Sequence, residues 1–140
     1  MAFKTGLPLD DALRNAINTA VACKNQHQQF AQKLAGSISA NDALQFANFL
    51  RTIIPQLQQC AAVPGIQAFA QAQYSDSTYD VGTEFTTMMS AIQSVLTWLE
   101  NNIPSNAVSV TSAKVTYSSF TPAQTAPLLT LVNDVVATIN

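Results

Sequence analysis

Apolar residues recur at helical spacing over most of this chain, and the clearest run lies between Asp80 and Pro104. Asp80 can cap the first turn of a helix with its carboxylate, and Pro104 stops the helix because it has no N–H and disfavours helical geometry at the residue before it. We expect this helix to be the central and most buried element of the core. Its apolar positions share one face of a 3.6-residue helix; they are Val81, Phe85, Met88, Met89, Ile92, Val95, Leu96 and Leu99.

A first helix is predicted from Pro8 to Ala35, with Gly36 as its stop. Its apolar positions follow a heptad-like seam, in which the chain's one histidine, His27, takes a place. Cys23 precedes His27 by four residues, which is the spacing of half a metal site, but no second ligand pair accompanies it. We therefore expect a histidine at the edge of the seam, hydrogen-bonded to a neighbour. The seam comprises Leu13, Ala16, Ile17, Ala20, Cys23, His27, Phe30 and Leu34.

A second helix is predicted to begin near Ser39, because Ser39 and Asp42 have the spacing of a capping box. The apolar residues of this helix cover most of its circumference, and so wide an apolar face indicates contacts on two sides. Pro55 removes one backbone hydrogen bond and should kink the helix. Residues Ala61–Ile66 then break it. The apolar positions are Ala43, Leu44, Phe46, Ala47, Phe49, Leu50, Ile53, Ile54, Leu57, Cys60 and Ala61.

A short helix is expected to start at Pro64, and a polar loop, Ser75–Asp80, follows it. Three carboxylates lie in or near this loop: Asp76, Asp80 and Glu84. Their spacing does not match a calcium-binding loop, which needs ligands at alternate positions and a glycine at its sixth. We interpret them as loop and helix-capping acids.

The apolar period changes from helical to alternating after Pro104. Val108 and Val110 alternate with polar residues, as do Val115 and Tyr117. This pattern predicts two short strands joined by a turn, or one strand with a bulge. The segment from Ala107 to Phe120 either pairs with another chain through its edge or folds back over the ends of the helices. The candidate contact residues are Val108, Val110, Val115, Tyr117 and Phe120.

A last helix is predicted to begin with a capping box, Thr121 and Gln124, with Pro122 in the first turn. Pro127 removes a further hydrogen bond and should distort that turn. The inward stripe comprises Leu128, Leu131, Val132, Val135 and Ile139. The predicted fold class is mainly α: a single helical domain over residues 1–140, a bundle of about four to five helices with a short β-hairpin or extended segment before the C-terminal helix.

The chain carries few charges. Charged residues make up 10% of the 140 residues, and the formal net charge is −2. Gln, Asn, Ser and Thr replace the missing charge, and a neutral polar surface costs less to desolvate when a neighbour covers it. No basic patch indicates nucleic-acid binding, no apolar run is long enough for a membrane span, and no signal peptide is visible.

The sequence contains no arrangement typical of a catalytic or cofactor site. The chain's one histidine, His27, falls in the middle of a predicted helix, which does not favour a nucleophile–base pair; the four glycines are scattered, and no zinc spacing occurs. We expect no enzyme, no cofactor, no metal and no small-molecule substrate. Cys23 and Cys60 are expected to be buried free thiols in a protein made in a cytoplasm.

Three stretches together carry a resemblance to a known group of proteins. They are Ala61–Ile66 with Ala70–Gln73, then Thr97–Pro104, then Val115–Tyr117 leading into Phe120–Ala126. This resembles small virion structural and assembly proteins encoded in the structural gene clusters of tailed bacteriophages and prophages. The resemblance implies a particle component, at the neck, tail or capsid, that contacts other copies of itself and other virion proteins. The alternative is a free helical adaptor or assembly chaperone that is not part of the particle.

Overall fold

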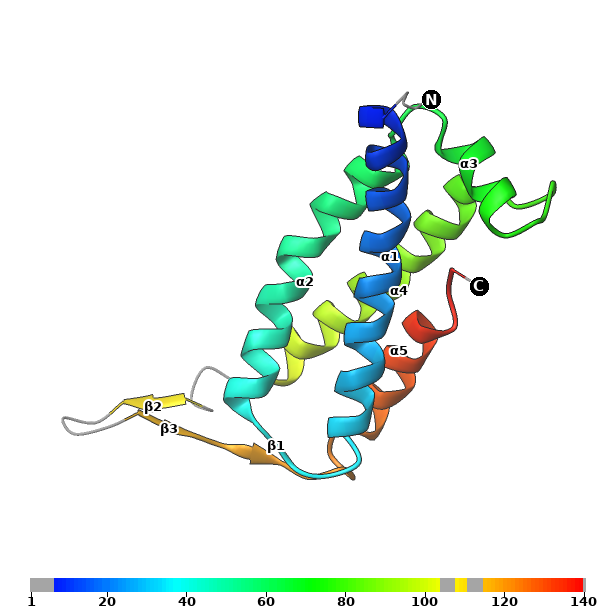
Figure 1. Cartoon of the computed structure of the whole chain (residues 1–140). Helices are drawn as coiled ribbons and strands as arrows, with labels where there is room; N and C mark the ends of the chain where they lie inside the picture. The colour runs from blue at the N-terminus through cyan, green and yellow to red at the C-terminus, as the bar shows by residue number, and fades with distance from the viewer. Residues whose placement is uncertain (1–6, 104–107, 111–114, 140) are drawn as a thin grey trace.

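A computed structural model describes residues 7–103, 108–110 and 115–139 and confirms the mainly helical fold class (Figure 1). Over these residues the elements follow in the order α1, β1, α2, α3, α4, β2, β3, β4, α5. The small antiparallel pair β2–β3 precedes the C-terminal helix, as the alternating period predicted.

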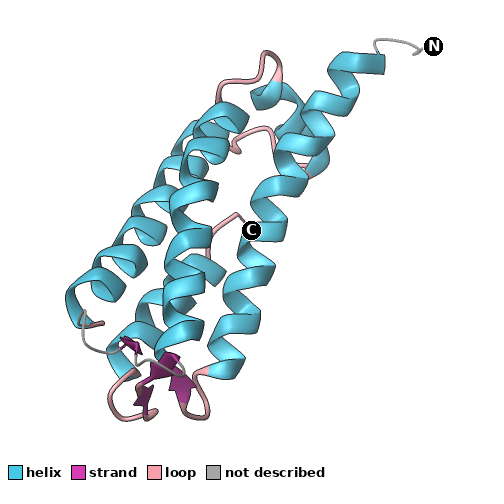
Figure 2. Ribbon diagram, turned by 90° about the vertical axis from the view of Figure 1, so that its left-hand side faces the viewer, coloured by secondary structure: helices cyan, strands magenta, loops and turns pink. Residues whose placement is uncertain are grey.

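Four helices surround the core. They are α1 (Leu7–Lys33), α2 (Ala40–Ala61), α4 (Val81–Asn102) and α5 (Ala126–Val136). The neighbouring pairs are α1 with α2, α2 with α4, α4 with α5, and α5 with α1, and the helices run side by side with the strands gathered at one end (Figure 2). The helix α4 is therefore one of the four helices packed around the core, which corrects the expectation that it lies at the centre.

The side of the core between α1 and α4 is covered by two short helices, α5 and α3. At about 1.5 Å per residue, α5 spans roughly 16 Å, while α1 spans about 40 Å. The short helix α3 (Ile66–Gln73) packs against α1 and α4 and covers part of the length that α5 leaves (Figure 1). Gly65 is the N-cap residue that precedes α3, and its φ of +86° is a left-handed conformation that glycine adopts without strain.

The predicted seam of α1 is buried along its whole length, including His27, which is 0% exposed. The histidine is thus an interior residue rather than one at the edge of the seam. The helix ends at Lys33, two residues before the predicted boundary, and the N–H of Gly36 donates to the carbonyl of Lys33 at 3.1 Å.

The predicted capping box of α2 is present in both directions. The Ser39 hydroxyl accepts from the Asp42 N–H, and the Asp42 carboxylate accepts from the Ser39 N–H, both at 3.2 Å. The helix packs against α1 on one side and α4 on the other, which explains its wide apolar face. It remains one helix through the exposed Pro55.

The helix α4 begins and ends where the sequence predicted. The Asp80 carboxylate accepts from the Thr83 N–H at 3.2 Å, and Ile103 is extended, as a residue before a proline should be. Seven of the eight predicted apolar positions are buried, and Met89 is half-buried at the edge of the core.

The strands form two separate antiparallel pairs. β2 (Val108–Val110) pairs with β3 (Val115–Tyr117), with Val108 opposite Tyr117 and Val110 opposite Val115. Two strands are therefore present, rather than one bulged strand. A second pair, which the sequence did not predict, joins β1 (Ile38–Ser39) to β4 (Ser119–Phe120).

The start of α5 combines the predicted cap with the predicted distortion. The Thr121 N–H donates to the Gln124 side-chain oxygen at 2.8 Å, and the Gln124 N–H donates to the Thr121 hydroxyl at 3.3 Å. Regular helix nevertheless begins only at Ala126, because Pro127 has no N–H for the carbonyl of Ala123. The capping box therefore closes a separate turn ahead of the helix.

Candidate functional site

The β2–β3 ribbon extends outward from the end of the bundle at which α1 ends and α2 begins (Figure 1). Four of the five candidate contact residues, Val108, Val110, Val115 and Tyr117, lie in it. The register places them in two directly opposed pairs. Among the residues described, neither strand pairs with a third strand, so each presents one outer edge of backbone N–H and C=O groups.

The fifth candidate, Phe120, lies in a different environment. It stands opposite Ile38 in the β1–β4 pair and packs, half-buried, against the core. The N–H of Ala40 donates to the carbonyl of Ser118 at 2.6 Å, which continues the same pairing. The end of the segment is thus engaged within the chain, while the ribbon that precedes it points away.

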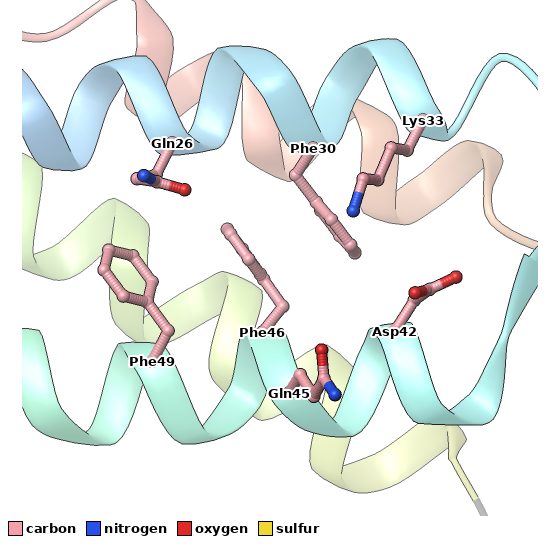
Figure 3. Close-up of a pocket in the computed structure, with 7 residues that line it drawn as sticks. All are labelled: Gln26, Phe30, Lys33, Asp42, Gln45, Phe46 and Phe49. Carbon is pink, nitrogen blue, oxygen red and sulfur yellow. The ribbon is translucent and has the colours of Figure 1, made fainter.

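A groove of about 260 Å³ lies between α1 and α2 near the same end of the bundle (Figure 3). Phe30 of α1 and Phe46 of α2 stack in its floor, with ring centroids 4.0 Å apart and an interplanar angle of 4°. Phe49, half-buried, extends this floor, with its centroid 5.7 Å from that of Phe46. The heptad-like seam of α1 and the apolar face of α2 meet here, which is why the floor is aromatic.

The rim of this groove is polar and carries one charge of each sign. Gln26 and Lys33 line it from α1, and Asp42 and Gln45 line it from α2 (Figure 3). In the described part of the chain, the ion pairs join Arg14 to Asp11 and Arg51 to Glu100, and none joins Lys33 to Asp42. Sequence reasoning missed the groove, because its two sides belong to different helices and meet only when those helices pack.

His27 lies beneath this region, and its Nδ1 contacts both the backbone carbonyl and the sulfur of Cys23, one helical turn earlier. Its Nδ1 lies 2.9 Å from the carbonyl oxygen of Cys23, and since a carbonyl can only accept, Nδ1 carries the proton. The ring meets Phe46 edge-on at 5.0 Å between centroids. Its Nε2 is buried with no hydrogen-bond partner. Burial lowers the pKa of His27 to about 4, so the ring is neutral at pH 7.

Both cysteines are free thiols, but their surroundings differ. Cys23 is buried, and burial raises the pKa of its thiol to about 12. Cys60 is half-buried at the other end of the α1–α2 interface, and burial also raises the pKa of its thiol. A thiol with a raised pKa is mostly protonated at pH 7, so neither is an activated nucleophile.

Two of the three acidic residues around the polar loop, Asp76 and Asp80, bind groups within three residues of themselves. The Asp76 carboxylate accepts from the Thr78 hydroxyl and N–H at 2.6 and 2.9 Å, and these bonds lower the pKa of Asp76. Asp80 caps α4, and the bond from Thr83 lowers the pKa of Asp80. Over the described residues, no group of three His, Cys, Asp or Glu side chains is placed to hold a metal ion.

Two glutamines of α3, which the sequence did not single out, hold this loop. Gln67 donates to the Tyr79 carbonyl at 2.6 Å and accepts from the Val81 N–H at 2.8 Å. Gln71 donates to the carbonyls of Ser77 and Tyr79. They anchor the start of α4, which is a structural role.

Comparison of the chain with protein-family models, with curated proteins and with solved structures gave no match in any of the three. No helix among the described residues is long and apolar enough to cross a membrane.

Proposed function

We propose that this chain is a non-enzymatic structural protein of a tailed-phage particle, associated with the neck, tail or capsid, and that it acts through oligomeric protein–protein contacts. The observation that carries the proposal is the β2–β3 ribbon, which extends from the bundle and leaves an edge on each strand. A two-stranded ribbon is marginally stable in water by itself, and a further strand added at its edge completes its backbone hydrogen bonds.

The composition supports the same proposal. The segment from Ala107 to Phe120 contains one charged residue, Lys114, so few charges oppose pairing with a strand of another chain. The low overall charge and the amide-rich surface suit a protein that is covered by neighbours. The resemblance to small phage structural proteins supplies the particle as the setting.

Mass spectrometry of particles purified from the strain that encodes this chain tests the assignment. We expect the protein to be found in washed particles at a constant ratio to the major capsid or tail protein. Its absence from them, with the free protein abundant in the lysate, would instead favour a free adaptor or assembly chaperone.

The role of the ribbon is tested by Thr116→Lys, which places a charge on β3, where lysine disfavours edge pairing. We expect Thr116→Lys to reduce incorporation into particles by tenfold or more with the helical circular dichroism unchanged. The matched control is Thr130→Lys, the same exchange at an exposed position of α5. Equal incorporation of the two variants would reject the ribbon as the contact.

A further inference from the structure

The groove between α1 and α2 combines features that make a surface complementary to itself. Its rim carries one cation, Lys33, and one carboxylate, Asp42, on opposite helices (Figure 3). Its remaining polar rim is made of amides, Gln26 and Gln45, each of which has both a donor and an acceptor. A second, smaller hollow beside it, of about 70 Å³, adds another amide, Gln29.

We propose that this groove is a homodimer interface, in which a second copy of the chain packs against the same face through a twofold axis. Such an axis brings each residue i of one copy to residue j of the other and each j to i. Lys33 of each copy then meets Asp42 of its partner. Within one chain these two side chains do not form an ion pair with each other, whereas in the dimer each lies beside an opposite charge. The half-buried Phe49 lines the groove across from Gln26 and supplies apolar contact.

Other occupants fit this surface less well. A cationic segment is repelled by Lys33, and an anionic one by Asp42. A purely apolar segment would bury the amides of Gln26 and Gln45 without partners, which costs free energy for each unpaired group. A copy of the same surface offers an opposite charge to each charge, Asp42 to Lys33 and Lys33 to Asp42, and its amides Gln26 and Gln45 are exposed at the rim.

The nearby charges do not disturb this pairing. Arg51 on α2 donates to Glu100 of α4 at 3.1 Å and to Asn48, so its guanidinium is directed to the other side of the helix. The phenylalanine floor stays in place in the monomer, since Phe30 and Phe46 are 4% and 8% exposed. The dimer therefore requires no rearrangement of the bundle. Little apolar surface is left to bury, so the dimer is weak, with a dissociation constant in the range that modest interfaces show, about micromolar to millimolar.

The inference goes beyond the proposed function and does not depend on it, because it concerns the isolated chain in solution. Sedimentation equilibrium of the full chain from about 10 μM to about 1 mM, which brackets that range of dissociation constants, tests it. We expect a monomer–dimer equilibrium whose dissociation constant rises with added NaCl, because salt screens the two ion pairs.

A charge-exchange experiment identifies the face. Lys33→Glu and Asp42→Lys each place two like-charged pairs across the twofold axis, and each should raise the dissociation constant about tenfold or more. Mixing the two variants restores attraction in both pairs. The new carboxylate at position 33 of one chain faces the new ammonium at position 42 of the other, while the unchanged Asp42 and Lys33 form the second pair. We expect the mixture to form heterodimers, and a chain carrying both substitutions to dimerise like the original chain.

Matched controls keep this test independent of folding. Arg14→Glu makes the same charge change near the other end of α1 and should leave the dimer unchanged, and Lys33→Arg should keep it. Asp42→Lys also removes a partner of the α2 cap, so thermal unfolding is measured for each variant. If Asp42→Lys fails to fold, Lys33→Glu against Arg14→Glu still decides the matter. A chain that is monomeric at the highest concentration, or equal effects of Lys33→Glu and Arg14→Glu, would overturn the proposal.

Measuring the solution dimer also distinguishes a contact through the groove from a contact through the ribbon. Thr116→Lys should leave the solution dimer intact while it reduces incorporation into particles. Loss of the dimer in Thr116→Lys with retention in Lys33→Glu would place the self-contact on the ribbon and reject the groove.

Discussion

His27 is the residue at which the core departs most from simple apolar packing. The heptad-like pattern placed it in the seam of α1, but only the packed structure shows that it is 0% exposed and that its Nε2 has no partner. The bond from Nδ1–H to the Cys23 carbonyl fixes the tautomer, and the edge-on contact with Phe46 fixes the ring. Burial is the main influence on its pKa, and it disfavours the positively charged ring.

The first prediction concerns the pH dependence that follows from His27. The pKa of His27 is about 4 in the folded chain and about 6.5 in an unfolded one, so the unfolded state binds more protons between these values. Stability is therefore full above about pH 6.5 and falls as the pH drops toward 4, by roughly 3 kcal/mol in total. Urea unfolding at about pH 7 and about pH 4.5 should show most of this loss.

The control is His27→Leu, which removes the chain's one histidine while keeping an apolar side chain in the seam. Its stability should vary little over this pH range. Asp76 and Asp80, with lowered pKa values, lose their contribution only at more acidic pH. An equal pH dependence in His27→Leu and the original chain would contradict the assignment to His27.

The second prediction concerns the two thiols. Cys23 is 1% exposed and Cys60 is half-buried, so a thiol reagent should modify Cys60 first and leave Cys23 protected until the chain unfolds. Mass spectrometry after a timed reaction with iodoacetamide at about pH 8 measures this order. Comparable labelling of both thiols under native conditions would show that the α1 seam opens.

At the scale of the elements, some features follow from local sequence signals and others only from tertiary packing. The caps of α2 and α4 and the turn before α5 follow from short motifs, because the side chain and the N–H that it caps are three residues apart. The β1–β4 pair had no such signal. Two-residue strands show no period, and Ile38 and Phe120 are brought together only by the packing of the helices that flank them.

The third prediction tests the α2 capping box. Ser39→Ala removes the hydroxyl that accepts from the Asp42 N–H and should lower the free energy of unfolding by about 1 kcal/mol. Ser37→Ala, at an exposed position just before β1, is the matched control and should have little effect. Chemical denaturation of both variants gives the comparison, and equal losses would show that the cap is not the cause.

The fourth prediction tests the packed face of α4. Leu96 is 6% exposed, and Leu96→Ala should cost about 2–5 kcal/mol through lost burial and the cavity left behind. Leu44→Ala on α2 is the same exchange at a site that is 37% exposed, and we expect a loss of about 0.5 kcal/mol or less. A loss below that value for Leu96→Ala would mean that this face is not part of the core.

At the scale of the whole molecule, the bundle and the ribbon differ in how well they satisfy their own backbone. The four helices α1, α2, α4 and α5 share one core, whereas β2 and β3 form a two-stranded sheet at one end of the bundle (Figure 1). An element with few interior contacts opens more readily than the core.

The fifth prediction follows from this difference. In the isolated chain, amide hydrogens of β2 and β3 should exchange with solvent much faster than those of the middle of α4. In particles they should be protected if the ribbon pairs with another strand. Hydrogen exchange measured by mass spectrometry on both forms tests this, and equal exchange of the ribbon in the two forms would count against the proposed contact.

The sequence by itself determined the helices, the caps of α2 and α4, the break before α3, the two alternating strands and most of the core. These depend on residues within a few positions of one another, so periodicity and capping spacing are sufficient to predict them. Only the tertiary structure decided that α4 is one of four helices around the core and not its central element, that Phe120 pairs with Ile38, and that Lys33 and Asp42 face each other across an aromatic floor. Each of these requires two segments distant in sequence to pack together, and the geometry of that packing is set by the whole core at once.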